Sequence, residues 1–175
     1  MLTTISLPSI LTSEVYVSFD PGEKSNIGIA IFEPEKGQVI WYDQIRFENI
    51  QPTLDIIRQT SKILVIICED YMIFKHKARA HIGSKVETIQ AIGAIKAYAL
   101  GKHIEFVLQP ASILEIAEKW TQVKMPKDHS ISHSVSAFLH GAFYLIQNGK
   151  RKTALQETFV EPGPGEASPV PPQST

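Results

Sequence analysis

The sequence is poor in the features that mark secreted, membrane-bound or strongly basic proteins. Its 175 residues include one cysteine, Cys68, so an internal disulfide is excluded and a reducing compartment is indicated. The formal net charge is −1, so any surface that binds nucleic acid must be a local patch. No apolar run approaches the roughly 20 residues that span a bilayer, and residues 1–13 lack the basic start of a signal peptide. We therefore expect a cytoplasmic protein with no membrane contact.

The length and composition predict one folded domain with two unstructured ends. A chain of this size with 43% apolar residues can bury a sizeable core. Residues 1–13 are expected to form a flexible lead-in. Residues 151–175 end in a proline-rich stretch with almost nothing to bury, which predicts a disordered tail. The folded domain should therefore span residues 14–150.

Apolar periodicity and turn signals predict nine regular elements. Strands are expected near residues 15–20, 26–33, 38–47, 62–68 and 104–108. Helices are expected near residues 52–61, 83–100, 111–120 and 131–147. Three hairpin-linked strands followed by alternating helices and strands give an α/β fold, a mixed five-stranded sheet with helices on both faces.

Two carboxylates lie at the ends of predicted strands. Asp20 ends the first strand and opens a Pro-Gly turn, and Glu69 directly follows the apolar run 62–68. Aspartate before Pro-Gly is also a common turn initiator, so Asp20 alone has a purely structural explanation. Two strand-end carboxylates brought together by one sheet favour a site for a hard divalent cation.

Three motifs, in sequence order, carry a resemblance to a known family. They are Asp-Pro-Gly at residues 20–22, Glu69 after the fourth strand, and the helical stretch 133–142. The strand order resembles the ribonuclease H-like fold, and the motifs resemble those of RuvC-like Holliday junction resolvases, phage-encoded relatives in particular. The resemblance implies an endonuclease that resolves four-way or other branched DNA in a bacterial or phage-infected cell. It assigns the catalytic and metal-ligand positions to Asp20, Glu69, His133 and Ser136.

The same resemblance implies two Mg²⁺ ions, for which Mn²⁺ could substitute. Two ions about 4 Å apart can stabilise both the attacking and the leaving oxygen of an in-line displacement at phosphorus. Carboxylate oxygens suit Mg²⁺ well. The imidazole of His133 suits it less, and this residue could instead move protons.

Ser136 departs from the family pattern, in which this position is acidic. A hydroxyl offers one weak, uncharged oxygen, so one ion would be poorly held and cleavage would be attenuated. Three explanations are open: attenuation in nature, deliberate inactivation, or replacement of the ligand by Asp70 or Asp128.

Two other functions compete with the nuclease. A catalytically silent module that binds branched DNA is favoured by Ser136. The second competing function is that of one half of a sugar-kinase or actin-like ATPase, because Asp-x-Gly at a strand end also introduces a phosphate-binding hairpin. A single such motif in 175 residues does not supply the two domains that a nucleotide cleft needs.

A basic segment follows the strand that ends near Glu69. Residues 74–85 contain four Lys or Arg, two His and no acid. Such a segment can neutralise phosphates, although charge runs are often only a solvated surface. An aromatic side chain there can wedge against unstacked bases. The DNA-binding candidates are Tyr71, Phe74, Lys75, Lys77, Arg79, Lys85, Lys124 and Lys127.

Symmetry suggests a partner for the chain. A four-way junction presents two equivalent strands, so the resemblance implies a homodimer with a two-fold axis. The apolar positions Ile89, Ile92 and Ile95 could form its interface or belong to the core. His140 and Trp120 are expected to be packing residues rather than ligands.

Overall fold

The computed structural model describes residues 14–22, 26–71, 84–127 and 132–149. The predicted lead-in and the whole of the predicted tail lie outside the described residues, so the domain limits stay a prediction. The elements in chain order are β1 (Glu14–Pro21), β2 (Ile27–Glu33), β3 (Gln38–Ile45), η1 (Phe47–Asn49), α1 (Ile50–Thr60), β4 (Lys62–Asp70), α2 (Ser84–Gly101), β5 (Glu105–Pro110), η3 (Ala111–Ile113), α3 (Leu114–Thr121) and α4 (Ser132–Gln147). Among the helices in the described ranges, none has the length and apolar character needed to cross a membrane.

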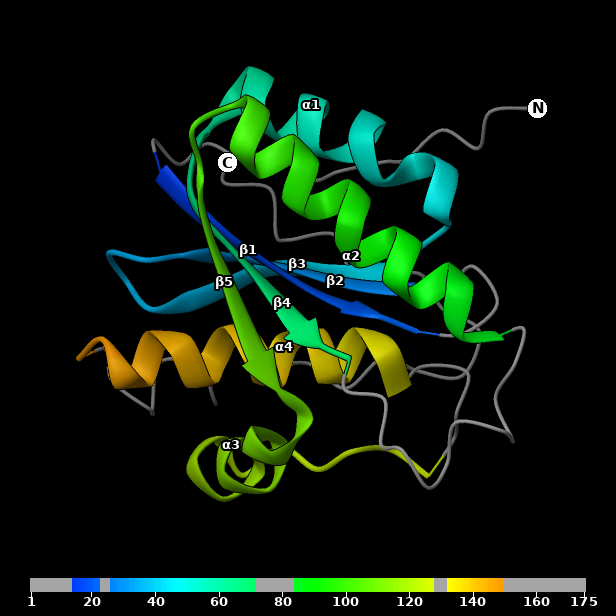
Figure 1. Cartoon of the computed structure of the whole chain (residues 1–175). Helices are drawn as coiled ribbons and strands as arrows, with labels where there is room; N and C mark the ends of the chain where they lie inside the picture. Colours follow the sequence, from blue (N-terminus) through cyan, green and yellow to red (C-terminus); the bar gives the residue numbers. More distant parts are fainter. Residues whose placement is uncertain (1–13, 23–25, 72–83, 128–131, 150–175) are drawn as a thin grey trace, which may run out of the picture.

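The five strands form one mixed sheet in the order β3-β2-β1-β4-β5. The hairpin neighbours β1–β2 and β2–β3 are antiparallel. The pairs β1–β4 and β4–β5 are parallel; α1 leads from β3 into β4, and α2 leads from β4 into β5. The predicted α/β architecture is therefore confirmed, with every predicted strand and helix present (Figure 1).

Several element boundaries differ from the prediction, and three of these places have a local physical reason. β5 continues through Pro110, which is tolerated because β5 is an edge strand and needs no further ladder hydrogen bond there. The helix expected over 111–120 is a 3₁₀ turn followed by α3, which ends where Gln122 adopts a left-handed conformation. α1 begins at Ile50, so Pro52 lies within its first turn, where its missing N–H costs nothing.

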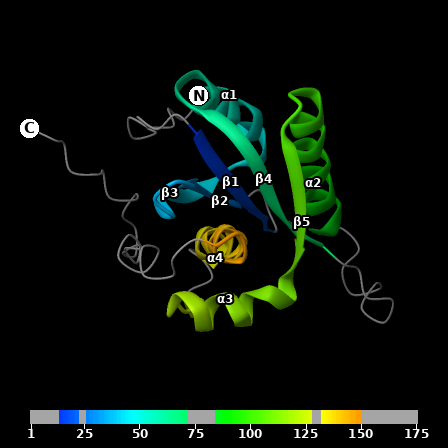
Figure 2. The ribbon, with the colours of Figure 1, turned by 90° about the vertical axis from the view of Figure 1, so that its left-hand side faces the viewer.

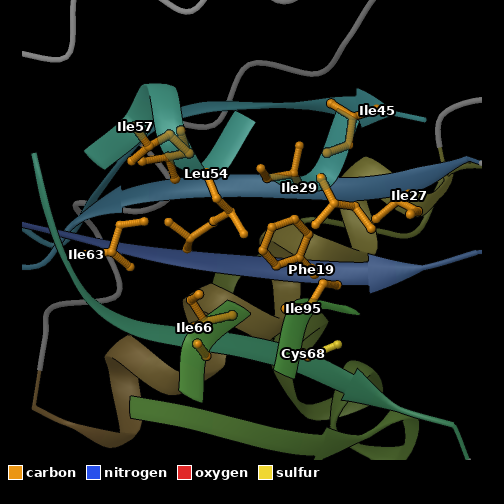
Figure 3. Packing of buried hydrophobic residues seen from close by; sticks show 14 of the residues in the cluster. Phe19, Ile27, Ile29, Ile45, Leu54, Ile57, Ile63, Ile66, Cys68 and Ile95 are labelled. Carbon is orange, nitrogen blue, oxygen red and sulfur yellow. The ribbon is translucent and has the colours of Figure 1, made fainter. Parts of the chain in front are cut away.

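Helices cover both faces of the sheet. α1 and α2 lie against one face, α4 lies against the other, and α3 packs on the outer side of α4 (Figures 1 and 2). The core beneath α1 and α2 is apolar, and ten of its residues are labelled in Figure 3: Phe19, Ile27, Ile29, Ile45, Leu54, Ile57, Ile63, Ile66, Cys68 and Ile95. Among the three candidate interface residues, Ile95 is fully buried here and Ile92 packs against this core, whereas Ile89 is 49% exposed.

α4 is enclosed between the sheet and α3. This explains why its sequence is apolar nearly all round, a pattern typical of a buried helix. Trp120 of α3 stacks on Phe143 of α4 with 5.2 Å between ring centroids, so the expected packing role of Trp120 is confirmed. Gly141 allows the close approach on the sheet side, because a Cβ there would lie 2.1 Å from the ring of Phe32.

Candidate metal centre

The carboxyl ends of the three parallel strands place the candidate acids side by side. Phe19 of β1 is paired with Cys68 of β4, so Asp20 and Glu69 occupy the next position of neighbouring strands. Glu69 is in turn paired with Gln109 of β5. Because strand side chains alternate between faces, all three polar side chains point to the α4 side of the sheet, opposite Phe19 and Cys68. Asp20 and Glu69 thus lie on neighbouring strand ends, and each contacts a side chain from the first two turns of α4.

His133, in the first turn of α4, is paired with Asp20. The Nδ1 atom of His133 lies 3.0 Å from Oδ2 of Asp20. Two glycines of the β1–β2 hairpin make this approach possible. A Cβ on Gly22 would lie 2.3 Å from Nε2 of His133, and a Cβ on Gly28 would lie 1.8 Å from its carbonyl oxygen. The start of α4 is therefore seated directly against the hairpin that carries Asp20.

Glu69 is held by two side chains of α4. Its Oε2 accepts a hydrogen bond from Oγ of Ser136 at 3.3 Å. The same oxygen lies 3.0 Å from Nε2 of His140, and the other ring nitrogen of His140 lies 2.9 Å from Oε1 of Gln109. His140 has no exposed surface. Its expected burial is confirmed, but its partners are residues of the site.

Sequence reasoning overlooked both His140 and Gln109 as neighbours of Glu69. A signal for His140 was present, because it lies four residues after Ser136 and hence on the same face of the helix. Gln109 carried no comparable signal, since its place depends on the β4–β5 register.

Two side chains at this edge of the sheet are donors of the kind that a hard cation prefers. Asp20 and Glu69 supply carboxylate oxygens, and Asp20 is 8% exposed. Within the described ranges, however, no three His, Cys, Asp or Glu side chains are grouped so as to hold a metal ion. Each carboxylate instead has an imidazole on one oxygen, His133 on Asp20 and His140 on Glu69.

The carboxylates set the electrostatics of the adjacent core. Burial raises the pKa of the Cys68 thiol well above its ordinary value, and the nearby negative charges of Asp20, Glu69 and Asp70 raise it further. A thiol in this setting stays protonated and is a poor metal ligand or nucleophile. Cys68 is accordingly a core residue beneath the site.

Asp70 and Asp128 are the two candidate replacements for the missing acid. Asp70 is the last residue of β4 and is half-buried. Strand alternation turns it to the face opposite Glu69, away from Ser136, so it is poorly placed to replace that ligand. Asp128 lies outside the described residues.

Of the candidate DNA-binding residues, three have described side chains. Tyr71 follows β4 and is half-buried, whereas Lys124 and Lys127 are exposed in the segment between α3 and α4. Nζ of Lys124 lies 3.4 Å from a carboxylate oxygen of Glu118. Lys85 lies in the first turn of α2, but its side chain is outside the described part, as are the remaining candidates: Phe74, Lys75, Lys77 and Arg79.

Comparison with known proteins gives matches in structure but none in sequence. No protein-family model matches the chain, and no curated protein sequence matches it significantly. Thermus thermophilus RuvC in complex with a Holliday junction substrate superposes with a TM-score of 0.55 and 12% identity, over 78% of this chain and 96% of that one. This chain has a RuvC-like fold. A second structure of T. thermophilus RuvC agrees, with a TM-score of 0.52, 13% identity and coverage of 78% and 98%.

The match extends over nearly the whole RuvC chain. The RuvC-like fold thus accounts for the complete sheet with its covering helices and not for a shared fragment. It is a ribonuclease H-like architecture, as the order of strands and helices predicts. At 12–13% identity the likeness establishes the fold, and the chemistry must be argued from the residues present.

Proposed function

We propose that this chain is a divalent-metal-dependent endonuclease for four-way or otherwise branched DNA, with a centre weakened by Ser136. The observation that carries the proposal is the placement of Asp20 and Glu69 on neighbouring strand ends beneath the first turns of α4. The RuvC-like fold supports the choice of substrate, since one of the matched RuvC structures is a complex with a Holliday junction.

Asp20 and Glu69 would hold Mg²⁺, and Mn²⁺ could replace it because both prefer oxygen ligands. When bound, the ion supplies Lewis-acid stabilisation of the charge that develops on the phosphoryl group. His133 is fixed against Asp20, so it is placed to move a proton at the edge of the site. Ser136 contributes a neutral hydroxyl where a third carboxylate would add charge, which favours loose binding of a second ion and slow cleavage.

The DNA would lie along the side chains that surround the strand ends. We place phosphate contacts at the exposed Lys124 and Lys127 and at the basic residues of the segment after β4, with Tyr71 and Phe74 against unstacked bases. Two copies related by a two-fold axis would match the two equivalent strands of a junction. Ile89, exposed on α2, is the remaining surface candidate for the dimer contact.

Cleavage and binding of a labelled four-way junction test this function. Wild type, Asp20→Asn and Ser136→Asp are compared on the junction and on linear duplexes of the same arms, in Mg²⁺ and in Mn²⁺. We expect all three to prefer the junction, Ser136→Asp to cut faster than wild type, and Asp20→Asn to bind without cutting. Equal cutting by wild type and Ser136→Asp would show that position 136 is not a ligand position. Equal affinity for junction and duplex would contradict branched-DNA recognition.

A catalytically silent branched-DNA-binding module is the second candidate. It is favoured by the pairing of each carboxylate with an imidazole and by the absence of a three-ligand group in the described ranges. The same assay separates the two functions. Tight, salt-dependent junction binding with no cutting by wild type or Ser136→Asp, in either metal, would establish the silent module.

A further inference from the structure

The hydrogen bonds of Glu69 are distributed unequally between its two carboxylate oxygens. Oε2 accepts from both Ser136 and His140. Oε1 accepts no hydrogen bond from the residues that the structure describes, although the side chain is 19% exposed at the open edge of the site. One oxygen is therefore engaged by the protein and the other is left for a bound group.

We propose that His140 is a positioning residue that fixes the orientation of Glu69 and presents Oε1 to the cation. The proposal rests on the proposed function in one respect, namely that the bound group is a divalent metal. Nothing in the motifs that suggested Asp20, Glu69, His133 and Ser136 as site residues assigns this role to His140.

The geometry makes His140 a rigid support. Its ring is fully buried in α4 and is held at both ends, by Glu69 at Nε2 and by Gln109 at Nδ1. A carboxylate only accepts hydrogen bonds, so Nε2 must donate to Glu69. Rotation of the Glu69 carboxylate would break this bond and leave a buried N–H without a partner, which is unfavourable.

Gln109 is the hydrogen-bond partner of the other ring nitrogen of His140, Nδ1. Gln109 is itself buried, and its amide lies on the strand next to Glu69. An amide can donate through its NH₂ group or accept through its oxygen, and rotation by 180° exchanges the two. Gln109 can therefore satisfy Nδ1 of His140 whether that nitrogen carries a proton or not. The chain Gln109–His140–Glu69 thus ties the buried imidazole to the ends of β4 and β5.

The role of His140 matters more here because Ser136 is uncharged. With only two carboxylates at the site, cation binding depends strongly on how well each of them is oriented. Side chains that orient metal ligands by hydrogen bonds typically change metal affinity 10–100-fold when they are removed.

Manganese binding followed by electron paramagnetic resonance tests the proposal without relying on cleavage. His140→Leu keeps bulk but removes the donor, whereas His140→Gln restores a donor near the position of Nε2. Tyr144→Phe is the matched control, because it removes a hydrogen bond from the same helix to Glu105, outside the site. We expect His140→Leu to weaken Mn²⁺ binding 10–100-fold, and His140→Gln and Tyr144→Phe to stay close to wild type. Circular dichroism establishes that each variant is folded.

The outcomes separate this inference from the proposed function. If wild type and a folded His140→Leu bind Mn²⁺ equally well, the positioning role is wrong and the metal site stands. If His140→Leu does not fold, Gln109→Leu is measured in its place. We expect Gln109→Leu to lose Mn²⁺ affinity by a smaller factor, and an unchanged affinity would contradict the proposal. If wild type binds no Mn²⁺, the metal-dependent function fails.

In that last case the metal-free protein still decides whether His140 holds Glu69. The imidazole N–H resonance of His140, observed in ¹⁵N-histidine-labelled protein, should shift in Glu69→Gln and stay in place in Tyr144→Phe. A resonance that does not respond to Glu69→Gln would overturn the positioning role.

Discussion

Replacement of Ser136 by aspartate should make the stability of this protein depend on divalent metal. Oγ of Ser136 lies 3.3 Å from Oε2 of Glu69, and Ser136 is 1% exposed. The substitution removes a hydrogen bond to Glu69 and puts a second carboxylate beside it. In the absence of metal, the new carboxylate at a buried position then faces the carboxylate of Glu69, which is only 19% exposed.

The size of the effect follows from this separation. Two unit charges about 4 Å apart repel by about 4 kcal/mol at an effective dielectric constant of about 20. Protonation of one carboxylate limits the cost, since each pKa unit is worth about 1.4 kcal/mol. For a protein of this size, about 1 kcal/mol lowers Tm by roughly 2–4 °C, so Ser136→Asp should melt on the order of 10 °C below wild type in EDTA.

Metal should reverse much of this loss. A ligand at 100 times its Kd stabilises the folded state by about 2.7 kcal/mol, which corresponds to a recovery of roughly 5–10 °C. Thermal melts of wild type, Ser136→Asp and Ser136→Asn are compared in EDTA, in MgCl₂, and in NaCl of matched ionic strength. Asparagine has the shape of aspartate without its charge, so its melt should respond little to Mg²⁺. The reasoning is refuted if Ser136→Asp melts like wild type in EDTA, or if Mg²⁺ raises both variants equally.

Two further predictions concern the packing around the site and the opposite face of the sheet. Gly28→Ala would place a Cβ 1.8 Å from the carbonyl oxygen of His133, so we expect a loss of about 1–3 kcal/mol or more in urea unfolding. Gly93→Ala is its control, because a Cβ at this position of α2 meets nothing within 4 Å. In a helix, replacing glycine by alanine should stabilise the folded state by about 0.5–1 kcal/mol. Equal destabilisation by both substitutions would contradict the close approach of α4 to Gly28. Burial and the hydrogen bond that Tyr98 donates to Asp55 raise the pKa of Tyr98 to about 12. Because this folded-state pKa lies above the unfolded value of about 10, the stabilisation is complete below pH 10 and is lost as pH rises towards 12. Wild type should therefore lose more free energy of unfolding than Tyr98→Phe between pH 9 and pH 11.5. Urea unfolding of both proteins at the two pH values measures this, and an equal loss in both would contradict the prediction.

Local patterns determined the elements of this protein and the residue types at its site. Short apolar runs bounded by Pro-Gly and Gly turns are typical of strands. The helices are recognised from apolar residues that recur with a 3.6-residue period, a pattern that does not depend on distant contacts. Asp20 and Glu69 were identifiable because each lies at the end of a strand, and parallel strands present their carboxyl ends at one edge. The RuvC-like fold confirms that this local information was sufficient for the architecture.

Only the tertiary structure decided what each of these residues touches. The pairing of Phe19 with Cys68, and of Glu69 with Gln109, is a register set by packing over the whole sheet. The seating of α4 against the β1–β2 hairpin selects which of its polar side chains reach the strand ends, and so brings His140 to Glu69. The four-residue spacing from Ser136 places His140 on the same face of α4, but the contacts of both residues with Glu69 span about 70 positions of the sequence. Only burial and hydrogen bonding in the assembled fold can specify contacts of that range.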